Sequence, residues 1–500
     1  MYSLPKFVKR YFEPKLAQTS YLIGCTVTGE AIVIDPNRDV DQYIEAARDQ
    51  GVRVSHVTET HIHADFLSGS RELRAKTGAT LYLSDEGDAS WKYGFAGDER
   101  TRLVKHGDRL AVGNVRLDVV HTPGHTPEHL AFLVTDGAVA NEPIAAATGD
   151  FIFVGDVGRP DLLERAANLK GTMEAGARTL YQQVRKFAER PDWLQIWPAH
   201  GAGSACGKGI SAIPQSTLGY EKRFNWAFRA ASEADFVKSV LAGQPEPPKY
   251  FAMMKRLNKE GPRILNGFPH PPLANVQTLS RELADGGLVV DTRRAADFGT
   301  GHVPGTINIP MNGSFTNWAG WLVPFDRDVY LIVDGHGDQA AHAAAAAARD
   351  LAMIGLDRIA GYFESGVVDQ WVHAGRPLAK IAHIDTTDLA ESLRHKGVTL
   401  IDVRSEAEWE VGRIDGAMHV MLGYLADRLD DIPREKPIVL QCQSGSRSAI
   451  GASLLRARGF DRVANLAGGF TAWARAGLPV NTERPVNTSG AELGMSTSPD

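Results

Sequence analysis

Two stretches in the second half of this 500-residue chain repeat each other, and the repeat restricts the folds available to it. Each copy covers about 100 residues and places a strand-type run before a helical run, which indicates two βα domains and too few units for a solenoid. We therefore predict two consecutive α/β domains with parallel sheets. The matching pairs are 289–293 with 400–404, 301–309 with 412–420, 330–333 with 438–441, and 355–358 with 459–462.

The first half of the chain alternates strand-type runs, such as Ala31–Asp35, with helical runs, such as Asp41–Asp49, which indicates a further α/β domain. Ser232, three residues before an acidic residue, predicts a capped last helix. Gly- and Pro-rich segments then bracket one short helix, predicted over 251–259. The predicted organisation is a domain over 1–242, a linker with a short helix over 243–272, repeat domains over 273–380 and 381–480, and a disordered tail over 481–500.

The composition is that of a globular protein, with 43% hydrophobic residues, 23% charged residues and a net charge of -6. This charge gives no reason to expect nucleic acid or an anionic membrane surface as a partner. We find no secretory signal and no apolar stretch of membrane-spanning length. The widely spaced Cys25, Cys206 and Cys442 indicate reduced thiols in a cytoplasmic protein. We expect small molecules as partners and a homo-oligomer.

Three short motifs in the first half follow strand-type runs, so their side chains should meet at strand ends, where a rigid sheet can hold metal ligands. The motifs are Thr60-His61-Ile62-His63-Ala64-Asp65-Phe66, Pro123-Gly124-His125-Thr126 and Thr148-Gly149-Asp150. Two imidazoles and one carboxylate with open coordination positions suit non-haem Fe(II), which must bind O₂ and an anionic substrate side by side. A zinc hydrolase would use more of the cluster.

These motifs resemble the metallo-β-lactamase fold, an αββα sandwich whose usual first motif is His-x-His-x-Asp-His. Phe66 stands in place of the last His, which removes a ligand from a second metal position and favours a single metal. Together with Gly158–Asp161, the motifs are similar to the persulfide dioxygenase branch of this fold. That resemblance implies one Fe(2+) per chain held by His61, His125 and Asp150, with His63 and Asp65 orienting ligands or water. The two latter side chains could instead be satisfied by backbone groups.

Three more residues of this domain are predicted to touch the substrate. Arg159 could pair with a carboxylate or sulfonate group, or it could lock its loop against Asp161. His200 occupies the place of the fold's last metal-site His, and we expect it to line the site. Cys206 could approach a bound persulfide or be an inert buried thiol. Glutathione-specific relatives are expected to carry a Tyr soon after the His-Gly pair, and its absence here puts glutathione as the thiol carrier in doubt.

His121 and His129 share a spacing of four residues with His125, as ligands on one helix would. Pro123 and Gly124 exclude a helix at this point. We therefore predict that only His125 binds metal and that the two other imidazoles have packing roles.

Cys442 lies between a buried-type strand and a helical stretch over 449–458. A thiolate at such a turn faces backbone N–H groups and the positive end of the helix, which stabilises the anion and a terminal persulfide. The loop resembles the rhodanese active loop, Cys-x-x-Gly-x-Arg-Ser, and the segments 402–404 and 468–473 fit the same family. The resemblance implies Cys442 as the catalytic nucleophile and a substrate-binding loop of Gln443, Ser444, Gly445, Ser446 and Arg447.

In the preceding copy, Asp334 replaces the cysteine and Gln339 replaces the arginine. This copy cannot carry sulfur by the same chemistry, and we predict an inactive rhodanese domain that is a spacer or an assembly surface. A binding role for Asp334 or His336 stays open.

The whole chain resembles persulfide dioxygenase–rhodanese fusions, which implies an α/β multidomain enzyme with a metallo-β-lactamase sandwich followed by an inactive and an active rhodanese-type domain. By that resemblance, the first domain oxidises a low-molecular-weight persulfide with O₂ to sulfite and thiol in sulfide detoxification. Cys442 then interconverts persulfide plus sulfite with thiosulfate plus thiol. Two alternatives stay open: a glyoxalase II-like zinc thioesterase fused to sulfurtransferase domains, and a non-enzymatic sulfur carrier or sensor.

Overall fold

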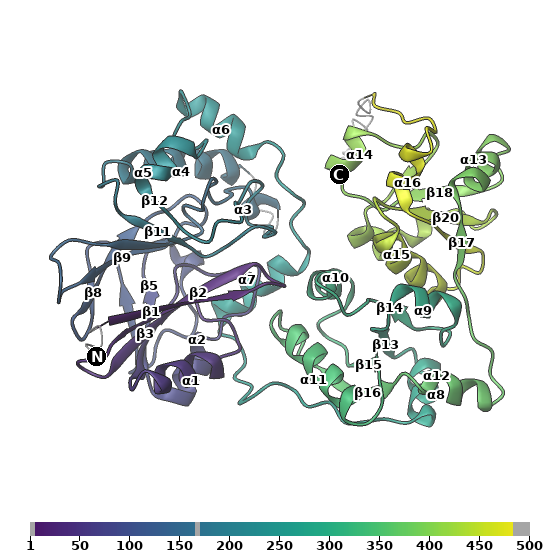
Figure 1. Ribbon diagram of the computed structural model, residues 1–500, viewed down its shortest axis with the longest axis horizontal. Coiled ribbons are helices and arrows are strands. Elements are labelled where there is room, and N and C mark those ends of the chain that lie inside the picture. The colour runs from purple at the N-terminus through teal and green to yellow at the C-terminus, as the bar shows by residue number, and fades with distance from the viewer. Residues whose placement is uncertain (1–5, 166–170, 484–500) are drawn as a thin grey trace, which may run out of the picture. The chain divides into compact units, whose positions relative to one another are not determined.

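Two six-stranded β-sheets form the centre of the first part of the chain (Figure 1). The computed structural model describes residues 6–165 and 171–483. The first sheet has the order β1 (Lys6–Glu13), β2 (Gln18–Cys25), β3 (Glu30–Ile34), β4 (Arg53–Thr58), β5 (Thr80–Ser84), β6 (Thr101–Val104). The second has the order β12 (Ser216–Thr217), β11 (Gln195–Pro198), β10 (Ala145–Gly149), β9 (Leu130–Asp136), β8 (Val115–His121), β7 (Arg109–Val112).

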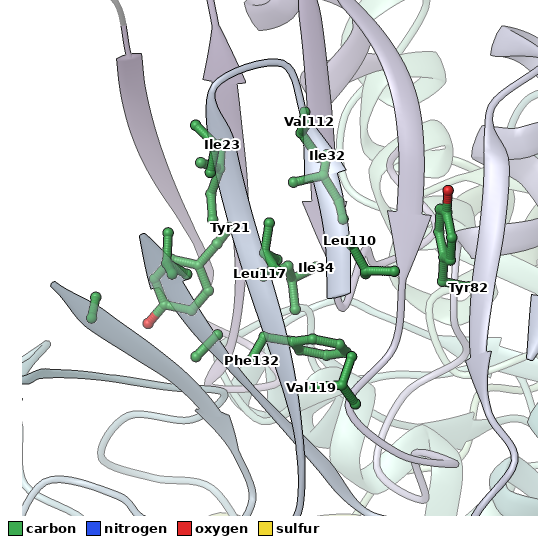
Figure 2. Packing of buried hydrophobic residues seen from close by; sticks show 14 of the residues in the cluster. Tyr21, Ile23, Ile32, Ile34, Tyr82, Leu110, Val112, Leu117, Val119 and Phe132 are labelled. Atoms are coloured by element: carbon green, nitrogen blue, oxygen red, sulfur yellow. The ribbon is translucent and has the colours of Figure 1, made fainter. Parts of the chain in front are cut away.

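The faces that the two sheets turn toward each other are apolar and form one core (Figure 2). Residues two apart on a strand share a face, so Ile32 and Ile34 of β3 enter this core while Val33 joins the core on the outer face. Leu117 and Phe132 of the second sheet meet the two isoleucines, and all five side chains are inaccessible to solvent. Burial of this apolar surface, worth roughly 25 cal/mol per Å², holds the sheets face to face.

Helices cover the outer face of each sheet. Helices α1 (Asp41–Asp49) and α2 (Ser70–Thr77) pack on the first sheet, and α4 (Thr172–Phe187) and α6 (Glu233–Leu241) pack on the second. The αββα sandwich expected from the resemblance is therefore present. The remaining helical elements of this part are η1 (Ala89–Trp91), α3 (Leu162–Arg165), α5 (Leu218–Phe224) and α7 (Tyr250–Glu260).

Local sequence signals predicted several of these elements. Helix α1 has the bounds expected from its apolar spacing. The Ser232 hydroxyl accepts a hydrogen bond from the Asp235 backbone N–H at 3.1 Å and caps α6, as predicted. Helix α7 lies within the segment predicted as a linker.

The chain forms two compact units, of which the first joins residues 1–293 with 309–370 and the second joins 294–308 with 371–500. The predicted domain boundaries therefore stay predictions. The middle copy contributes three parallel strands and three helices that lie wholly within the first unit. These are α8 (Val276–Ala284), β13 (Leu288–Asp291), α10 (Phe315–Leu322), β15 (Val329–Val333), α11 (Asp338–Ala352) and β16 (Ile359–Glu364).

The second unit contains a parallel sheet in the order β17 (Ala382–Ile384), β21 (Val463–Leu466), β20 (Ile438–Gln441), β18 (Thr399–Asp402), β19 (Met418–His419). Its helical elements are α13 (Thr386–Arg394), α14 (Glu406–Val411), η2 (Leu422–Asp427), η3 (Leu429–Asp431), α15 (Ser446–Ala457) and α16 (Gly469–Arg475). Helix α9 (Ala295–Thr300) and β14 (Ile307–Asn308) also belong to this unit, and α12 (Val367–His373) leads into it. The parallel sheets predicted for both copies are thus present.

The tail predicted to be disordered lies, from residue 484 onward, outside the described residues. Within residues 6–165 and 171–483, none of the helices has both the length and the apolar character that crossing a membrane requires.

Candidate functional site

His61, His125 and Asp150 come together although they lie on three separate loops, which follow β4, β8 and β10. One ligand atom from each residue lies within 4.8 Å of the others. Nε2 of His125 is 3.5 Å from Oδ2 of Asp150, and Nε2 of His61 is 4.0 Å from the same oxygen. All three side chains are buried, so these atoms face one another in a site from which bulk water is excluded.

Hydrogen bonds orient both imidazoles of this group. The Thr60 hydroxyl donates to Asp35 at 2.9 Å, so it accepts from Nδ1–H of His61, also at 2.9 Å. Nδ1 of His125 donates to the backbone carbonyl of Arg159 at 2.9 Å. When Nδ1 carries the proton, Nε2 offers a lone pair, so both lone pairs point toward Asp150.

The donor set fits a divalent cation. Burial lowers the pKa of His61 and of His125, which keeps the two imidazoles neutral and able to act as ligands. Both carboxylate oxygens of Asp150 are buried, and within the described residues no backbone N–H, lysine or arginine bonds to them. A buried carboxylate without donors is costly unless a cation compensates it.

The segment that carries Asp150 is held by His129. Its Nδ1 bonds to the Thr122 hydroxyl at 2.8 Å, and its Nε2 accepts from the Asp150 backbone N–H at 3.1 Å. Gly149 has φ 53°, and a Cβ there would lie 2.6 Å from the Thr60 hydroxyl oxygen and 2.7 Å from Nε2 of His129. Only glycine fits this position. No sequence signal predicted this role of His129, because the spacing of the histidines carries no information about which backbone group each one meets.

His121 and His63 both turn to partners outside the group of His61, His125 and Asp150. Nε2 of His121 bonds to the Pro127 carbonyl at 2.7 Å. Nε2 of His63 lies 3.1 Å from Asp35, and although burial lowers the pKa of His63, this carboxylate raises it to about 9. Asp35 therefore orders the loop through both Thr60 and His63, a function that the sequence analysis did not predict.

Phe66 is fully buried, and its ring centroid lies 4.4 Å from that of His63. The position at which the family motif has an imidazole is therefore filled by an apolar ring. This residue cannot serve as a metal ligand.

A second group of possible ligands consists of Asp65, His200 and Cys206, which are all buried. Nε2 of His200 is 3.2 Å from Asp65 and 3.3 Å from Asp150, so this group adjoins the first. Nδ1 of His200 bonds to the Ala17 carbonyl at 3.0 Å. Burial raises the pKa of Asp65 and that of the Cys206 thiol, and the Asp65 carboxylate raises the thiol's pKa further. Asp65, His200 and Cys206 therefore lie next to the group of His61, His125 and Asp150. Their roles in orienting ligands or lining the site stay predictions.

Arg159 is completely buried and forms two hydrogen bonds with Asp161, at 2.8 and 2.7 Å. Its remaining terminal nitrogen donates to the Ala205 carbonyl at 3.0 Å. This geometry corresponds to the alternative in which Arg159 locks its loop, and it ties that loop to the one that carries Cys206. A substrate-binding role for Arg159 stays a prediction without geometric support.

Cys442 lies directly after β20 and is buried. Its Sγ accepts from the backbone N–H of Gly445 at 3.2 Å and from the Ser448 hydroxyl at 3.3 Å. Gly445 precedes α15 with φ 96°, and the loop turns the Gly445 amide toward the sulfur at the N-terminal end of the helix. These donors stabilise a sulfur anion. Ser448 is a donor that the sequence analysis did not single out.

Arg447 forms a paired contact with Glu408, with both N···O distances 2.6 Å. Burial raises the pKa of Glu408, but Arg447 outweighs it and lowers this pKa to about 2. Glu408 is also the N3 residue of the capping box that begins α14. In the sequence, Glu408 is recognisable only as part of the Ser-x-x-Glu pattern. This pattern indicates the start of a helix and does not predict the contact between Glu408 and Arg447.

The remaining predicted loop residues bond mostly to each other and to α16. The Gln443 amide donates to the Thr471 hydroxyl at 3.0 Å, and the hydroxyls of Ser444 and Ser446 are 3.4 Å apart. All three side chains reach the surface, where an anionic substrate could contact them.

The corresponding loop of the middle copy follows β15 and has a different chemistry. The backbone N–H of Gly337 donates to the Glu364 carboxylate at 2.8 Å, and Nδ1 of His336 is 3.2 Å from the same side chain. An acidic side chain thus takes an amide that could otherwise hold an anion.

Two family models match the chain, one of them twice. The model described as the metallo-beta-lactamase superfamily matches residues 14–200, and the rhodanese-like domain model matches residues 275–371 and again 385–476. Both matches fall on the sandwich and the two repeat copies described above.

A solved metallo-beta-lactamase structure from Staphylococcus aureus is 43% identical to the chain, with a TM-score of 0.64. The match covers 72% of this chain and 99% of the Staphylococcus aureus chain. Hydroxyacylglutathione hydrolase of Rhodospirillum rubrum is 30% identical over 259 residues, which are 48% of this chain and 93% of the hydrolase. Persulfide dioxygenase ETHE1 of Bos taurus is 29% identical over 199 residues, 39% of this chain and 68% of the dioxygenase. The chain therefore belongs to the metallo-beta-lactamase superfamily and carries two rhodanese-like domains after its metallo-beta-lactamase domain.

Proposed function

We propose that the metallo-beta-lactamase domain is a non-haem Fe(II) persulfide dioxygenase and that the C-terminal rhodanese-like domain transfers sulfur through Cys442. The first reaction converts a low-molecular-weight persulfide RSSH, with O₂ and water, to thiol RSH, sulfite and protons. The second reaction joins the outer sulfur of a persulfide to sulfite and gives thiosulfate and thiol. The first site thus produces the acceptor that the second consumes, which suits the removal of sulfide.

The convergence of two imidazole nitrogens and one carboxylate oxygen carries this proposal. A ferrous ion held by His61, His125 and Asp150 would supply open coordination positions for O₂ and for the persulfide anion. Phe66 supports a single metal because it offers no ligand to a second one. The similarity to persulfide dioxygenase supports the same chemistry.

The chain's own groups would prepare this site. The hydroxyl of Thr60 and the carbonyl of Arg159 fix the imidazoles of His61 and His125, so little reorganisation is needed when metal binds. Nε2 of His200 lies between Asp65 and Asp150, where it can move a proton to or from either carboxylate. The neutral thiol of Cys206 lies beside these groups and can donate a weak hydrogen bond toward a substrate sulfur.

Sulfur transfer at Cys442 needs two displacements. The thiolate attacks the outer sulfur of a persulfide, a new S–S bond forms to Cys442, and the old S–S bond breaks to release thiol. Sulfite then attacks the outer sulfur on Cys442, and the Cys442 thiolate leaves as thiosulfate forms. The amide of Gly445 and the hydroxyl of Ser448 stabilise the sulfur anion in each state. The reverse direction uses the same residues.

Oxygen consumption tests both steps together. The full chain is loaded with Fe(II) without oxygen and given a panel of persulfides, including those of coenzyme A, cysteine and glutathione, and sulfite and thiosulfate are both measured. We expect O₂ uptake in the wild type and in Cys442→Ser, with thiosulfate formed only by the wild type. Absence of O₂ uptake with every persulfide would contradict the dioxygenase.

The alternative is a zinc thioesterase fused to sulfurtransferase domains, and two observations favour it. The chain is similar to a hydroxyacylglutathione hydrolase, and Asp65, His200 and Cys206 form a second ligand group next to Asp150. Metal analysis of the purified chain separates the two proposals. Two zinc ions per chain, with thioester cleavage and no O₂ uptake, would support the hydrolase.

A sulfur carrier or sensor without catalysis is a further alternative. In that case His61→Ala would leave all sulfur handling intact, whereas the dioxygenase proposal expects loss of sulfite formation. A cytoplasmic location and a homo-oligomeric state stay predictions from the sequence.

A further inference from the structure

The loop that carries His61 is held at its beginning by the sandwich itself. The backbone N–H of Thr60 donates to Asp35 at 2.6 Å, and that of Ile62 donates to Glu128 at 2.8 Å. The Thr60 carbonyl accepts from the Leu130 N–H at 2.7 Å. Groups of the metallo-beta-lactamase domain therefore fix residues 60–62.

Groups from later parts of the chain hold the rest of this loop. The amide of Asn258 in α7 donates to the carbonyls of His63 and Phe66, both at 2.8 Å, and its oxygen accepts from the Ser68 N–H at 2.9 Å. The Leu67 N–H donates to the carbonyl of Met353, just after α11, at 2.9 Å. Asn258 is 1% exposed, and both its N–H groups and its oxygen are used, so no water competes for these bonds.

Ion pairs fasten the end of α11 to the same side of the sandwich. Arg38, with a side chain only 2% exposed, donates to Asp357 at 2.6 Å and to the Ala352 carbonyl at 2.9 Å. Arg349 pairs with Glu13 at 2.8 Å, and Asp350 pairs with Lys15. A buried arginine without its counter-charge is strongly destabilising. The pairing of Arg38 with Asp357 therefore fixes how the end of α11 lies against the sandwich.

The repeat provides an internal comparison for these contacts. Asp357 and Asp461 occupy matching positions, but the Asp461 side chain is 92% exposed. Gly355 and Gly459 match as well, and both have positive φ. A Cβ on Gly355 would lie 3.2 to 3.4 Å from side chains of α7 and of Leu67, whereas a Cβ on Gly459 would meet nothing within 4 Å. At these two pairs of positions, Asp357 and Gly355 pack against other elements, whereas Asp461 is exposed and Gly459 has open space beside it.

We propose that α7 and the cysteine-less middle copy position the metal-site loop, with Asn258 as the positioning residue. Asn258 binds the carbonyls of His63 and Phe66 and so fixes the backbone on either side of Asp65. His63 is two residues after the proposed ligand His61. The copy without a nucleophile therefore acts on the chemistry of the first domain through that loop. This inference rests on metal binding by His61, His125 and Asp150, as proposed above.

The test uses Co(II) as the probe on the full chain, in the wild type, in Asn258→Ala and in Arg256→Ala. Arg256 is an exposed residue of the same helix and is the control. The readouts are the Co(II) dissociation constant, the visible spectrum of bound Co(II), and sulfur transfer by Cys442, all at a temperature where every variant is folded. Loss of a group that orients a ligand costs 10- to 100-fold in metal affinity. We expect about 10-fold weaker Co(II) binding and a changed spectrum in Asn258→Ala, with Arg256→Ala and the sulfur transfer of all variants unchanged.

Wild-type affinity and spectrum in folded Asn258→Ala would overturn the inference, because a purely structural role changes only the folded fraction. If Asn258→Ala does not fold, Asp357→Asn is compared with Asp461→Asn. We expect a loss of a few-fold in Co(II) affinity in the former only, since Asp357 acts on the loop less directly, and equal affinities would overturn the inference. A wild-type chain that binds no Co(II) would overturn the proposed function and the inference with it.

Discussion

Helix α11 of the middle copy corresponds to α15 of the C-terminal copy, and the two rhodanese-like copies use opposite ends of this helix. In the C-terminal copy, the N-terminal end of α15 faces Cys442, and Gly445 and Ser448 donate to its sulfur. In the middle copy, the matching loop has no cysteine, while the residues at and beyond the C-terminal end of α11 bond to the metallo-beta-lactamase domain. The middle copy, which has no cysteine in this loop, is thus bound to the metallo-beta-lactamase domain at this end. The matching Asp461 of the C-terminal copy is exposed.

The largest effect should come from exchanging the nucleophile between the copies. Cys442→Ser should abolish sulfur transfer, because the reaction needs a covalent sulfur carrier. Asp334→Cys in that variant should not restore it, since Glu364 already takes the Gly337 amide in the middle copy. Thiosulfate formation from persulfide and sulfite measures both variants. Recovery of activity in the double variant would show that the two loops are equivalent after all.

His61→Ala separates the metal site from the sulfur-transfer loop. The variant removes one of three proposed ligands, so we expect metal binding to weaken more than about 100-fold, the upper end for residues that only orient ligands. Metal content and O₂ uptake measure this loss, and thiosulfate formation from added persulfide and sulfite should continue at the wild-type rate. Equal losses of both activities would mean that the variant had unfolded, which thermal denaturation would reveal.

Asp357→Ala and Asp461→Ala compare the docked and the exposed end of the two copies. Removal of Asp357 leaves the buried Arg38 without a counter-charge, and we expect a loss of about 3–5 kcal/mol in the free energy of unfolding of the first unit. Asp461 is an exposed residue, so its variant should stay within about 0.5 kcal/mol. Denaturant titration of the full chain measures both. Equal values for the two variants would argue against a docking role for Asp357.

The smallest effect concerns the pH dependence of the Cys442 domain. Arg447 holds the pKa of Glu408 at about 2, below its ordinary value of 4.5. A carboxyl with a lowered pKa contributes stability above its ordinary pKa, and this contribution is lost as the pH falls from about 4.5 through about 2. Because both side chains are partly exposed, we expect less than about 1 kcal/mol. Acid titration of wild type and Glu408→Gln should show the difference only below about pH 4.5.

Much of the fold and the main site residues could be predicted from local patterns. The continuous apolar run in β3 and the helical spacing of α1 are short-range signals, and both elements are present. The resemblance to known family motifs pointed to His61, His125 and Asp150, each of which lies on a loop after a strand. Because β4 belongs to the first sheet and β8 and β10 to the second, the packing of the two sheets decides that these residues meet. Cys442 was identifiable because its loop joins a strand to a helix within one continuous segment.

Other features depend on residues that are far apart in the chain, and only the tertiary structure decided them. Asn258 reaches the metal-site loop across 195 positions, and Arg38 reaches Asp357 across 319. The closeness of Asp65, His200 and Cys206, and the use of His129 to hold Asp150, are of the same kind. The sequence by itself determined which chemical groups each strand end presents, because that depends on neighbours along the chain. Which of those groups meet, and which copy supports the metal site, depends on how the finished elements pack, and no local pattern encodes that.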